Sequence, residues 1–220
     1  MVESPSIYNG ARNPFSYAKF EQVTRDTATP WISVEAICAQ LNLYGDDSQD
    51  TYLENLELAA RFAIEDYLGA SFFPIQYRAY YGDTGVYGST VALDLPEVSQ
   101  GTGTGGVGGV TVNEVGYYTD GTSGPVYNVL ASSAYNYDQT GNRVVINAIP
   151  NALSQNIANP LQVLYTTAVS PLMAYPVIKH AALMLITHLY NNRSTTVDSA
   201  IREIPYGADV LLRPYKPLVM

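Results

Sequence analysis

The sequence is poor in cysteine and in charge, and each shortage excludes a class of protein. Cys38 is the only cysteine among 220 residues, so no disulfide can form within the chain, as expected of a protein that folds in a reducing cytoplasm. Only 14% of the residues are charged, and 11 Lys and Arg face 20 Asp and Glu, for a net charge of -9. A nucleic-acid grip needs clustered cations, so we exclude sequence-specific DNA or RNA binding as the main function.

Long apolar runs are missing as well. The longest one, AALMLITHLY at 181–190, follows His180 and contains His188, and it is about half as long as the roughly 20 residues of a membrane span. The first residues, MVESPSIYNGARNPF, lack the basic and apolar regions of a signal peptide. We therefore expect no membrane contact.

Tyrosine is the residue that is present in excess. Its 19 copies outnumber every charged residue type. A tyrosine combines a large apolar ring with a hydroxyl that tolerates wet contacts, and it is enriched in strands and protein interfaces. The composition favours a chain with extensive protein contacts.

Periodicity predicts an α+β fold of about four helices with an inserted antiparallel β-sheet or small β-sandwich. Apolar spacing predicts helices near 34–41, 48–68 and 176–192 and a short one after 204, with Ser33, Gly69 and Pro176 at their ends. Between them, runs rich in Val, Ile, Tyr and Thr predict strands. These runs are IQYRAYYG, STVALDL, GGVTVNEVGYY, PVYNVLA, NRVVINA and LQVLYTT.

These patterns divide the chain into four parts. We expect an extended N-terminal arm at 1–30, loose in the monomer, and a helical core from 31–74 and 168–204. The β-rich insertion occupies 75–167. The last part, 205–220, is apolar and punctuated by proline, whereas a disordered tail is usually polar and charged. We therefore expect another surface to cover it.

Several residue types with potential chemistry have simpler explanations. The glycine-rich stretch 100–109 lacks the lysine of a phosphate loop and precedes a strand, which favours a flexible loop. His180 and His188 lie eight residues apart rather than four, so we expect no metal site. Cys38 is interpreted as a small buried hydrophobe. Four acidic residues on the second helix, Glu54, Glu57, Glu65 and Asp66, are expected on its solvated face, with a catalytic carboxylate pair as the alternative.

The order of the segments resembles the tailed-phage head–tail connector family, the adaptor or head-completion proteins beneath the portal. The resemblance rests on AARFAIEDYLG at 59–69, on the helical segment 176–193 and on IPYGADVLLRPY at 204–215. It covers about half of the chain. The long N-terminal arm and the enlarged β insertion depart from the compact members of the family.

The resemblance implies a structural virion protein of the bacteriophage neck, made in the host cytoplasm, with no enzymatic activity and no cofactor or metal. Such connectors form homo-oligomeric rings, commonly of twelve copies, that bind the portal and further neck or tail proteins. Double-stranded DNA passes through the lumen during ejection without sequence-specific binding. A carbohydrate- or receptor-binding β module of a phage tail is the alternative function.

The resemblance also implies that the terminal segments reach onto the portal or a neighbouring subunit. We expect this docking of seven residues in the C-terminal arm: Pro205, Tyr206, Leu211, Leu212, Arg213, Tyr215 and Lys216. We expect the glycine-rich loop to lie at the lumen or at a rim of the ring. Its glycines are Gly101, Gly103, Gly105, Gly106, Gly108 and Gly109.

Overall fold

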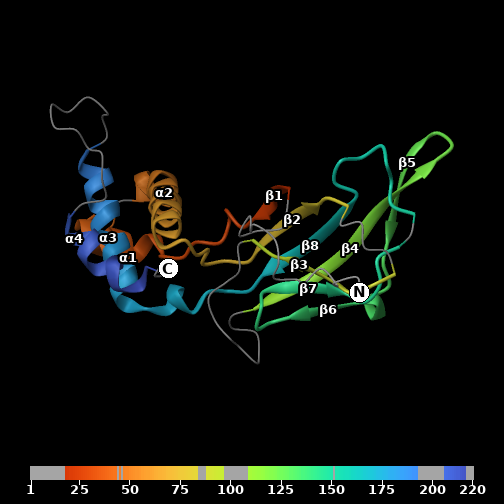
Figure 1. Ribbon diagram of the computed structural model, residues 1–220. Helices are drawn as coiled ribbons and strands as arrows, with labels where there is room; N and C mark the ends of the chain where they lie inside the picture. Colours follow the sequence, from red (N-terminus) through yellow and green to blue (C-terminus); the bar gives the residue numbers. More distant parts are fainter. Residues whose placement is uncertain are drawn as a thin grey trace. The chain divides into compact units, whose positions relative to one another are not determined.

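The computed structural model describes residues 18–43, 45, 47–83, 88–96, 109–150, 152–192 and 206–216. The described residues form four α-helices and eight strands, as the predicted α+β fold requires (Figure 1). The chain divides into two compact units. A β unit comprises residues 1–25 and 73–168, and a helical unit comprises residues 26–72 and 169–220.

The β unit contains two antiparallel sheets. Its strands are β1 (Lys19–Arg25), β2 (Ile75–Tyr81), β3 (Val91–Asp94), β4 (Val110–Gly121), β5 (Gly124–Val129), β6 (Tyr135–Asp138), β7 (Arg143–Ile146) and β8 (Leu161–Thr167). A 3₁₀ turn at Ser132–Ala134 precedes β6. The order of the larger sheet is β1-β2-β8-β4-β5, and that of the smaller sheet is β3-β7-β6.

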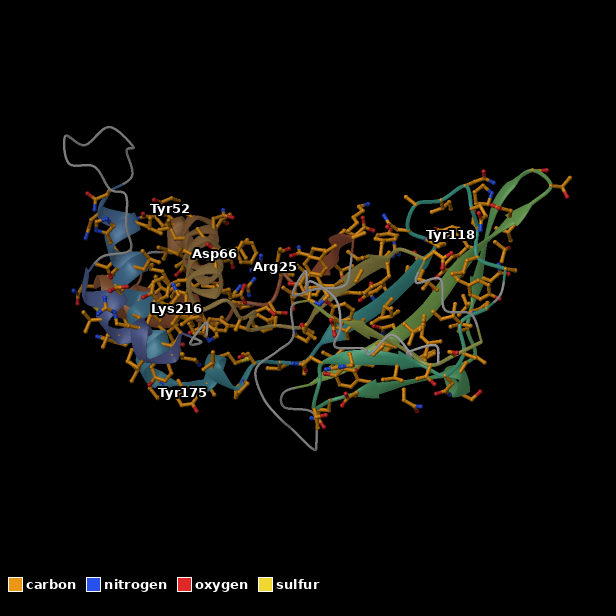
Figure 2. All side chains as sticks on the ribbon, in the orientation of Figure 1. Arg25, Tyr52, Asp66, Tyr118, Tyr175 and Lys216 are labelled. Carbon is orange, nitrogen blue, oxygen red and sulfur yellow. The ribbon has the colours of Figure 1, made fainter. Side chains whose placement is uncertain are left out.

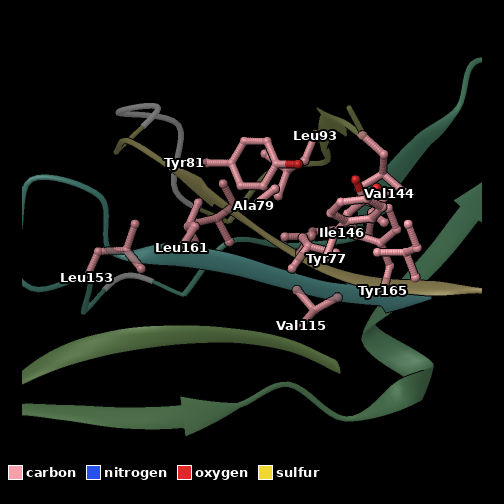
Figure 3. Packing of buried hydrophobic residues seen from close by; sticks show 14 residues of the cluster. Tyr77, Ala79, Tyr81, Leu93, Val115, Val144, Ile146, Leu153, Leu161 and Tyr165 are labelled. Atoms are coloured by element: carbon pink, nitrogen blue, oxygen red, sulfur yellow. The ribbon is translucent and has the colours of Figure 1, made fainter. Parts of the chain in front are cut away.

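The two sheets enclose one apolar core, as expected of a small sandwich. Strand β2 alternates between buried and half-buried residues, with Tyr77, Ala79 and Tyr81 on the core side. Figure 3 shows the core, to which the smaller sheet contributes Val144 and Ile146. Buried tyrosines need partners for their hydroxyls, and the Tyr81 hydroxyl donates to the Asp94 carbonyl at 2.7 Å. The period-2 pattern therefore fixes which face is buried.

The first strand corrects the prediction of a loose N-terminal arm for residues 19–25. Strand β1 pairs along its length with β2, from Lys19 opposite Tyr80 to Arg25 opposite Ile75. Phe20 stacks on Tyr77 with ring centroids 4.8 Å apart. Glu21 Oε1 accepts hydrogen bonds from the Arg78 guanidinium at 3.2 Å and from the Tyr80 hydroxyl at 2.8 Å. Cross-strand pairing and this polar cluster hold the segment as an edge strand; residues 1–17 lie outside the described residues.

The helical unit contains α1 (Val34–Leu41), α2 (Asp50–Leu68), α3 (Pro176–Asn191) and α4 (Tyr206–Leu212). Three short 3₁₀ turns occur at Asp47–Gln49, Pro171–Ala174 and Arg213–Tyr215. The predicted helix ends are confirmed: the Ser33 side chain accepts from the Ala36 N–H, and Gly69 adopts φ 62° at the end of α2. Glycine is favoured at this position because the helix ends with a residue in the left-handed conformation.

Helix α3 packs against α2, α1 and α4. Only one face is fully buried, formed by Ile178, Ala181, Ala182, Leu185 and Ile186. Val177 lies outside this face and remains 39% exposed. Among the described residues, no helix combines the length and apolar character that crossing a membrane requires.

Candidate functional site

The C-terminal residues form a surface on the helical unit, which we call the C-terminal surface and define by Tyr175, Val210, Arg213, Tyr215 and Lys216. These residues come from the turn before α3, from α4 and from the 3₁₀ turn that follows it, with Lys216 directly after that turn. Figure 2 labels Tyr175 and Lys216. The surface takes its position from the packing of α4 on α3.

Helix α4 is held by the chain's own core. Ala208 and Leu212 are fully buried, and a Cβ on Gly207 would lie only 2.7 Å from the Met184 Cε of α3. The small residues at 207 and 208 thus allow close approach of the two helices. This corrects the prediction for Leu212, because its side chain packs inside the helical unit and is not presented to a partner.

Polar contacts attach α4 and the 3₁₀ turn after it to α2. The Tyr67 hydroxyl donates to Asp209 Oδ1 at 2.5 Å, and Asp209 pairs with Arg213 one turn later at 3.7 Å. The hydrogen bond to Asp209 raises the pKa of Tyr67 above its ordinary value. Lys216 Nζ lies 4.7 Å from the centre of the Tyr67 ring, within the range of a cation–π contact.

The outward part of this surface combines apolar area with positive charge. Val210 and Tyr175 are 48% and 45% exposed, and the Tyr175 and Tyr215 rings lie 5.4 Å apart. Arg213 and Lys216 are exposed. Exposed aromatic residues together with arginine are enriched at protein interfaces. The arrangement suits a protein partner that offers acidic groups around an apolar recess.

The other residues predicted to function in docking or in a loop are only partly described. Leu211 is half-buried. Tyr206 begins α4, while Pro205 lies outside the described residues. The glycine-rich loop also lies outside them at Gly101, Gly103, Gly105, Gly106 and Gly108; of its predicted glycines only Gly109 is described, and its carbonyl accepts from the Ala168 N–H at 2.9 Å. The proposed roles of these residues stay predictions.

Sequence reasoning missed a buried charged trio on α2, formed by Glu57, Arg61 and Glu65. Their exposed fractions are 4%, 1% and 5%, respectively, which corrects the expectation that both glutamates lie on a solvated face. The three residues follow one another at four-residue steps and therefore lie on one side of the helix. The available signal was this Glu-Arg-Glu spacing on the side of α2 that also carries Leu53 and Ile64.

The trio attaches two irregular segments to α2. The Arg61 guanidinium donates to the carbonyls of Thr29 at 2.7 Å and of Asp26 at 2.8 Å. Glu57 Oε1 accepts from the Trp31 N–H at 3.2 Å, and Glu65 Oε1 accepts from the Phe72 N–H at 2.6 Å. Because these carboxylates are occupied by backbone donors and enclosed, they serve the fold rather than acid–base chemistry on a substrate.

Burial raises the pKa of Glu57, although Arg61 and the N–H groups of Trp31 and Ile32 act in the opposite direction. The native state thus binds this proton more tightly than the unfolded chain, whose glutamate pKa is about 4.3. The resulting stability is complete below the unfolded pKa and is lost as the pH rises through the native pKa. The contribution of Glu57 to the free energy of unfolding therefore falls with rising pH.

We predict that Glu57→Gln removes this pH-dependent contribution. The stability of the variant relative to the natural chain should increase as the pH rises from about 4 towards neutrality. The measurement is urea unfolding followed by the fluorescence of Trp31, the single tryptophan, which is buried in the helical unit. Glu54→Gln, at an exposed position of α2, is the control. The same pH trend in both variants would contradict the assignment to Glu57.

The remaining chemical candidates do not converge. Among the described residues, no group of three or more His, Cys, Asp or Glu side chains is arranged to hold a metal ion. Cys38 lies on α1, half-buried, while His188 lies on α3, where its ring is near the Asn192 amide. No sequence motif links Cys38 with His188, and the two residues lie on separate helices.

The tyrosine rings of the larger sheet pack mainly on one another and on other side chains of the β unit. Tyr118 and Tyr127 have ring centroids 5.1 Å apart, and the Tyr127 hydroxyl donates to Glu114. Burial and this hydrogen bond raise the pKa of Tyr127. A Cβ on Gly116 would overlap the Tyr127 hydroxyl, so glycine leaves room for the ring to lie across β4. This cluster stabilises the β4–β5 hairpin.

Comparison with known proteins gives matches among solved structures alone. No protein-family model matches the chain, and no curated protein matches it. A chain in the neck of an empty gene transfer agent (GTA) particle, computed with C6 symmetry, superposes with a TM-score of 0.58 and 18% sequence identity. The match covers 92% of this chain and 97% of that one.

Two further structures of the same kind of particle agree. A chain in the virion of the native gene transfer agent particle has a TM-score of 0.56 at 17% identity, with 91% of this chain and 96% of that one covered. A chain in the neck of the native particle, computed with C12 symmetry, has a TM-score of 0.51 at 18% identity over 92% and 97%. The chain has the fold of these particle proteins, which confirms the resemblance to head–tail connector proteins at the level of fold.

Proposed function

We propose that this protein is a structural component of a virion neck, a head–tail connector that forms a ring on the portal. The observation that carries the proposal is the shared fold over nearly the whole length of chains in gene transfer agent necks. The C6 and C12 symmetries used for those necks agree with a ring of repeated subunits. The C-terminal surface adds an exposed apolar and cationic contact area to this fold.

In the proposed ring, the described contacts serve assembly and not catalysis. Residues Leu211, Arg213, Tyr215 and Lys216 act in docking on the portal or on a neighbouring copy, while Leu212 supports them from the core. Further neck or tail proteins bind the same ring. The proposed location is the virion neck, after synthesis in the host cytoplasm.

The net charge supports passage of DNA through such a ring without a grip. Each copy carries a formal net charge of -9, and duplex DNA carries about one negative charge per 1.7 Å of its axis. A wall of the same sign repels the duplex rather than retaining it. The proposed lumen therefore lets DNA leave quickly, and the glycine-rich loop at 101–109 is proposed to lie at the lumen or at a rim.

The experiment that tests this function is the mass of the purified protein, measured by light scattering at several concentrations, alone and with portal rings from the same virus. We expect particles whose mass is a multiple of the 23.9 kDa chain, bound to portal. The variant Arg213→Glu/Lys216→Glu keeps the buried residues of α4 and should lose the bound ring.

A chain that remains monomeric at every concentration and does not bind portal rings would overturn the connector function. That result would favour the carbohydrate- or receptor-binding β module, for which the next measurement is a glycan array. The array should be probed with the natural chain and with Tyr118→Ala, because Tyr118 is one of the half-exposed tyrosines of the β4–β5 hairpin.

A further inference from the structure

A second surface of the helical unit has the opposite character to the C-terminal surface. A cleft of about 360 Å³ lies beside α1 and the turn that leads into α2. Its apolar part is formed by Val34, Cys38, Ala39 and Leu43, and its polar part by Gly45, Glu35, Asp47 and Asp50. Among the residues that the structure describes, no Lys or Arg lines it. We call it the α1 cleft.

The size and charge of the α1 cleft favour the binding of one or two side chains from a protein partner. Ligand pockets usually have volumes of roughly 300–1,000 Å³, so this cleft is at the small end. Glu35 and Asp47 are exposed at its edge. Exposed acids around an apolar recess attract a partner that carries cations beside an apolar group.

The C-terminal surface has these properties. It presents Val210 and the Tyr175–Tyr215 pair together with two cations, Arg213 and Lys216. Helices α1 and α4 each pack on α3, and in the described residues they make no comparable contact with each other. The acidic recess and the cationic surface are thus different parts of one unit.

We propose that the α1 cleft of one copy receives the C-terminal surface of the next copy. This inference rests on the proposed function, because it names the contact by which the ring closes. A contact between two different surfaces is heterologous, and repeating it generates a closed ring when the rotation between neighbouring copies closes. A standard protein contact buries about 800 Å² per partner, so the cleft forms the centre of a larger interface.

The single natural cysteine gives a direct test of this contact. Cys38 lines the α1 cleft, and Val210→Cys places a second thiol on the C-terminal surface without removing either cation. A short bismaleimide should then join neighbouring copies into a ladder of covalent oligomers on a denaturing gel. The ladder should extend to the number of copies in the ring, because every subunit contributes one thiol to each of its two contacts.

Two matched variants control for random collision. Val210→Cys/Cys38→Ala keeps only the engineered thiol, and a heterologous contact should leave it without the ladder. Ser133→Cys adds a thiol at an exposed position of the β unit while keeping Cys38, and it should also lack the ladder. The Ser133→Cys variant should retain the mass of the natural assembly in light scattering, and the mass of Val210→Cys/Cys38→Ala is compared with that of Val210→Cys before cross-linking.

Charge reversal gives a second, independent readout. In the Val210→Cys background, Arg213→Glu/Lys216→Glu should lower the cross-linking yield by about fivefold at low salt, since like charges would then face each other across the contact. Adding Glu35→Lys/Asp47→Lys to that variant should restore most of the yield, because the opposite charges face each other again. Adding salt should lower the cross-linking yield of the Val210→Cys variant that keeps its natural charges.

The outcomes separate this inference from the proposed function. A ladder that the charge swap abolishes and restores supports the contact. Ring-sized particles that bind portal but give no ladder overturn the contact and leave the connector function in place. A chain that stays monomeric alone and with portal overturns both.

Discussion

Replacing Arg61 by alanine is expected to destabilise the helical unit by about 3–5 kcal/mol, the usual effect of removing one partner from a buried ionic cluster. Arg61 is 1% exposed, and its guanidinium binds two carbonyls of the segment that precedes α1. Without it, Glu57 and Glu65 remain buried on either side of an uncharged gap, and those carbonyls lose their donors. Trp31 fluorescence during urea unfolding measures the loss.

The control for this prediction is Arg78→Ala, which also separates an arginine from a glutamate. Arg78 pairs with Glu21 at 3.2 Å, but each side chain is about one third exposed, and such pairs contribute about 0–1 kcal/mol. Because Arg78 belongs to the β unit, its effect is read by circular dichroism of the whole chain. Equal losses in the two variants would contradict the special role of the buried trio.

A rescue experiment tests the reason for the loss. Glu57→Gln/Arg61→Met/Glu65→Gln removes all three charges together, so no buried charge is left without a partner. Replacing a complete buried ionic cluster by neutral residues of similar volume is often neutral or stabilising. The triple variant should therefore be more stable than Arg61→Ala. A triple variant that is equally unstable would show that packing around Arg61, and not charge, dominates.

Helix α2 illustrates how much of the fold the sequence could predict. Its length, its apolar face and its end at Gly69 follow from periodicity and from the backbone freedom of glycine, and the structure confirms them. The burial of Glu57 and Glu65 does not follow, because a charge is buried only when distant parts of the chain supply partners. Those partners are backbone groups near residues 26–32 and at Phe72, which periodicity cannot place beside α2.

The strands show the same division. Six of the eight were predicted, because their alternating Val, Ile and Tyr residues match a half-buried sheet. The exceptions are β1 and β6. Strand β1 has the sequence KFEQVTR and β6 has YNYD. Edge strands tolerate charged and polar residues, so such segments resemble loops until their pairing partner is known.

The apolar C-terminal segment was predicted to be buried against another surface. In the structure one side of α4 is buried within the helical unit and the opposite side is exposed. Ala208 and Leu212 are covered by the chain's own helices, which a sequence cannot distinguish from cover by a partner. Val210, Arg213 and Lys216 face outward and remain available for docking. Spacing of four residues marks the inner side, since 208 and 212 lie one turn apart.

This division leads to the second large effect, in which neighbouring apolar residues of α4 give opposite results. Leu212→Ala should destabilise the helical unit by about 2–5 kcal/mol, because it leaves a cavity at a fully buried site. Val210→Ala removes a side chain that is 48% exposed and should change stability by about 0.5 kcal/mol or less. Trp31 fluorescence in urea again measures both free energies.

Assembly should show the reverse order at conditions where both variants are folded. At low temperature and without denaturant, Leu212→Ala keeps the outward residues and should still form the assembly of the natural chain, whereas Val210→Asp places a charge in the docking contact and should reduce it at unchanged stability. Light scattering measures the mass in each case. Normal assembly by Val210→Asp would show that the outward side of α4 does not dock, and the C-terminal residues would then serve only the fold of the helical unit.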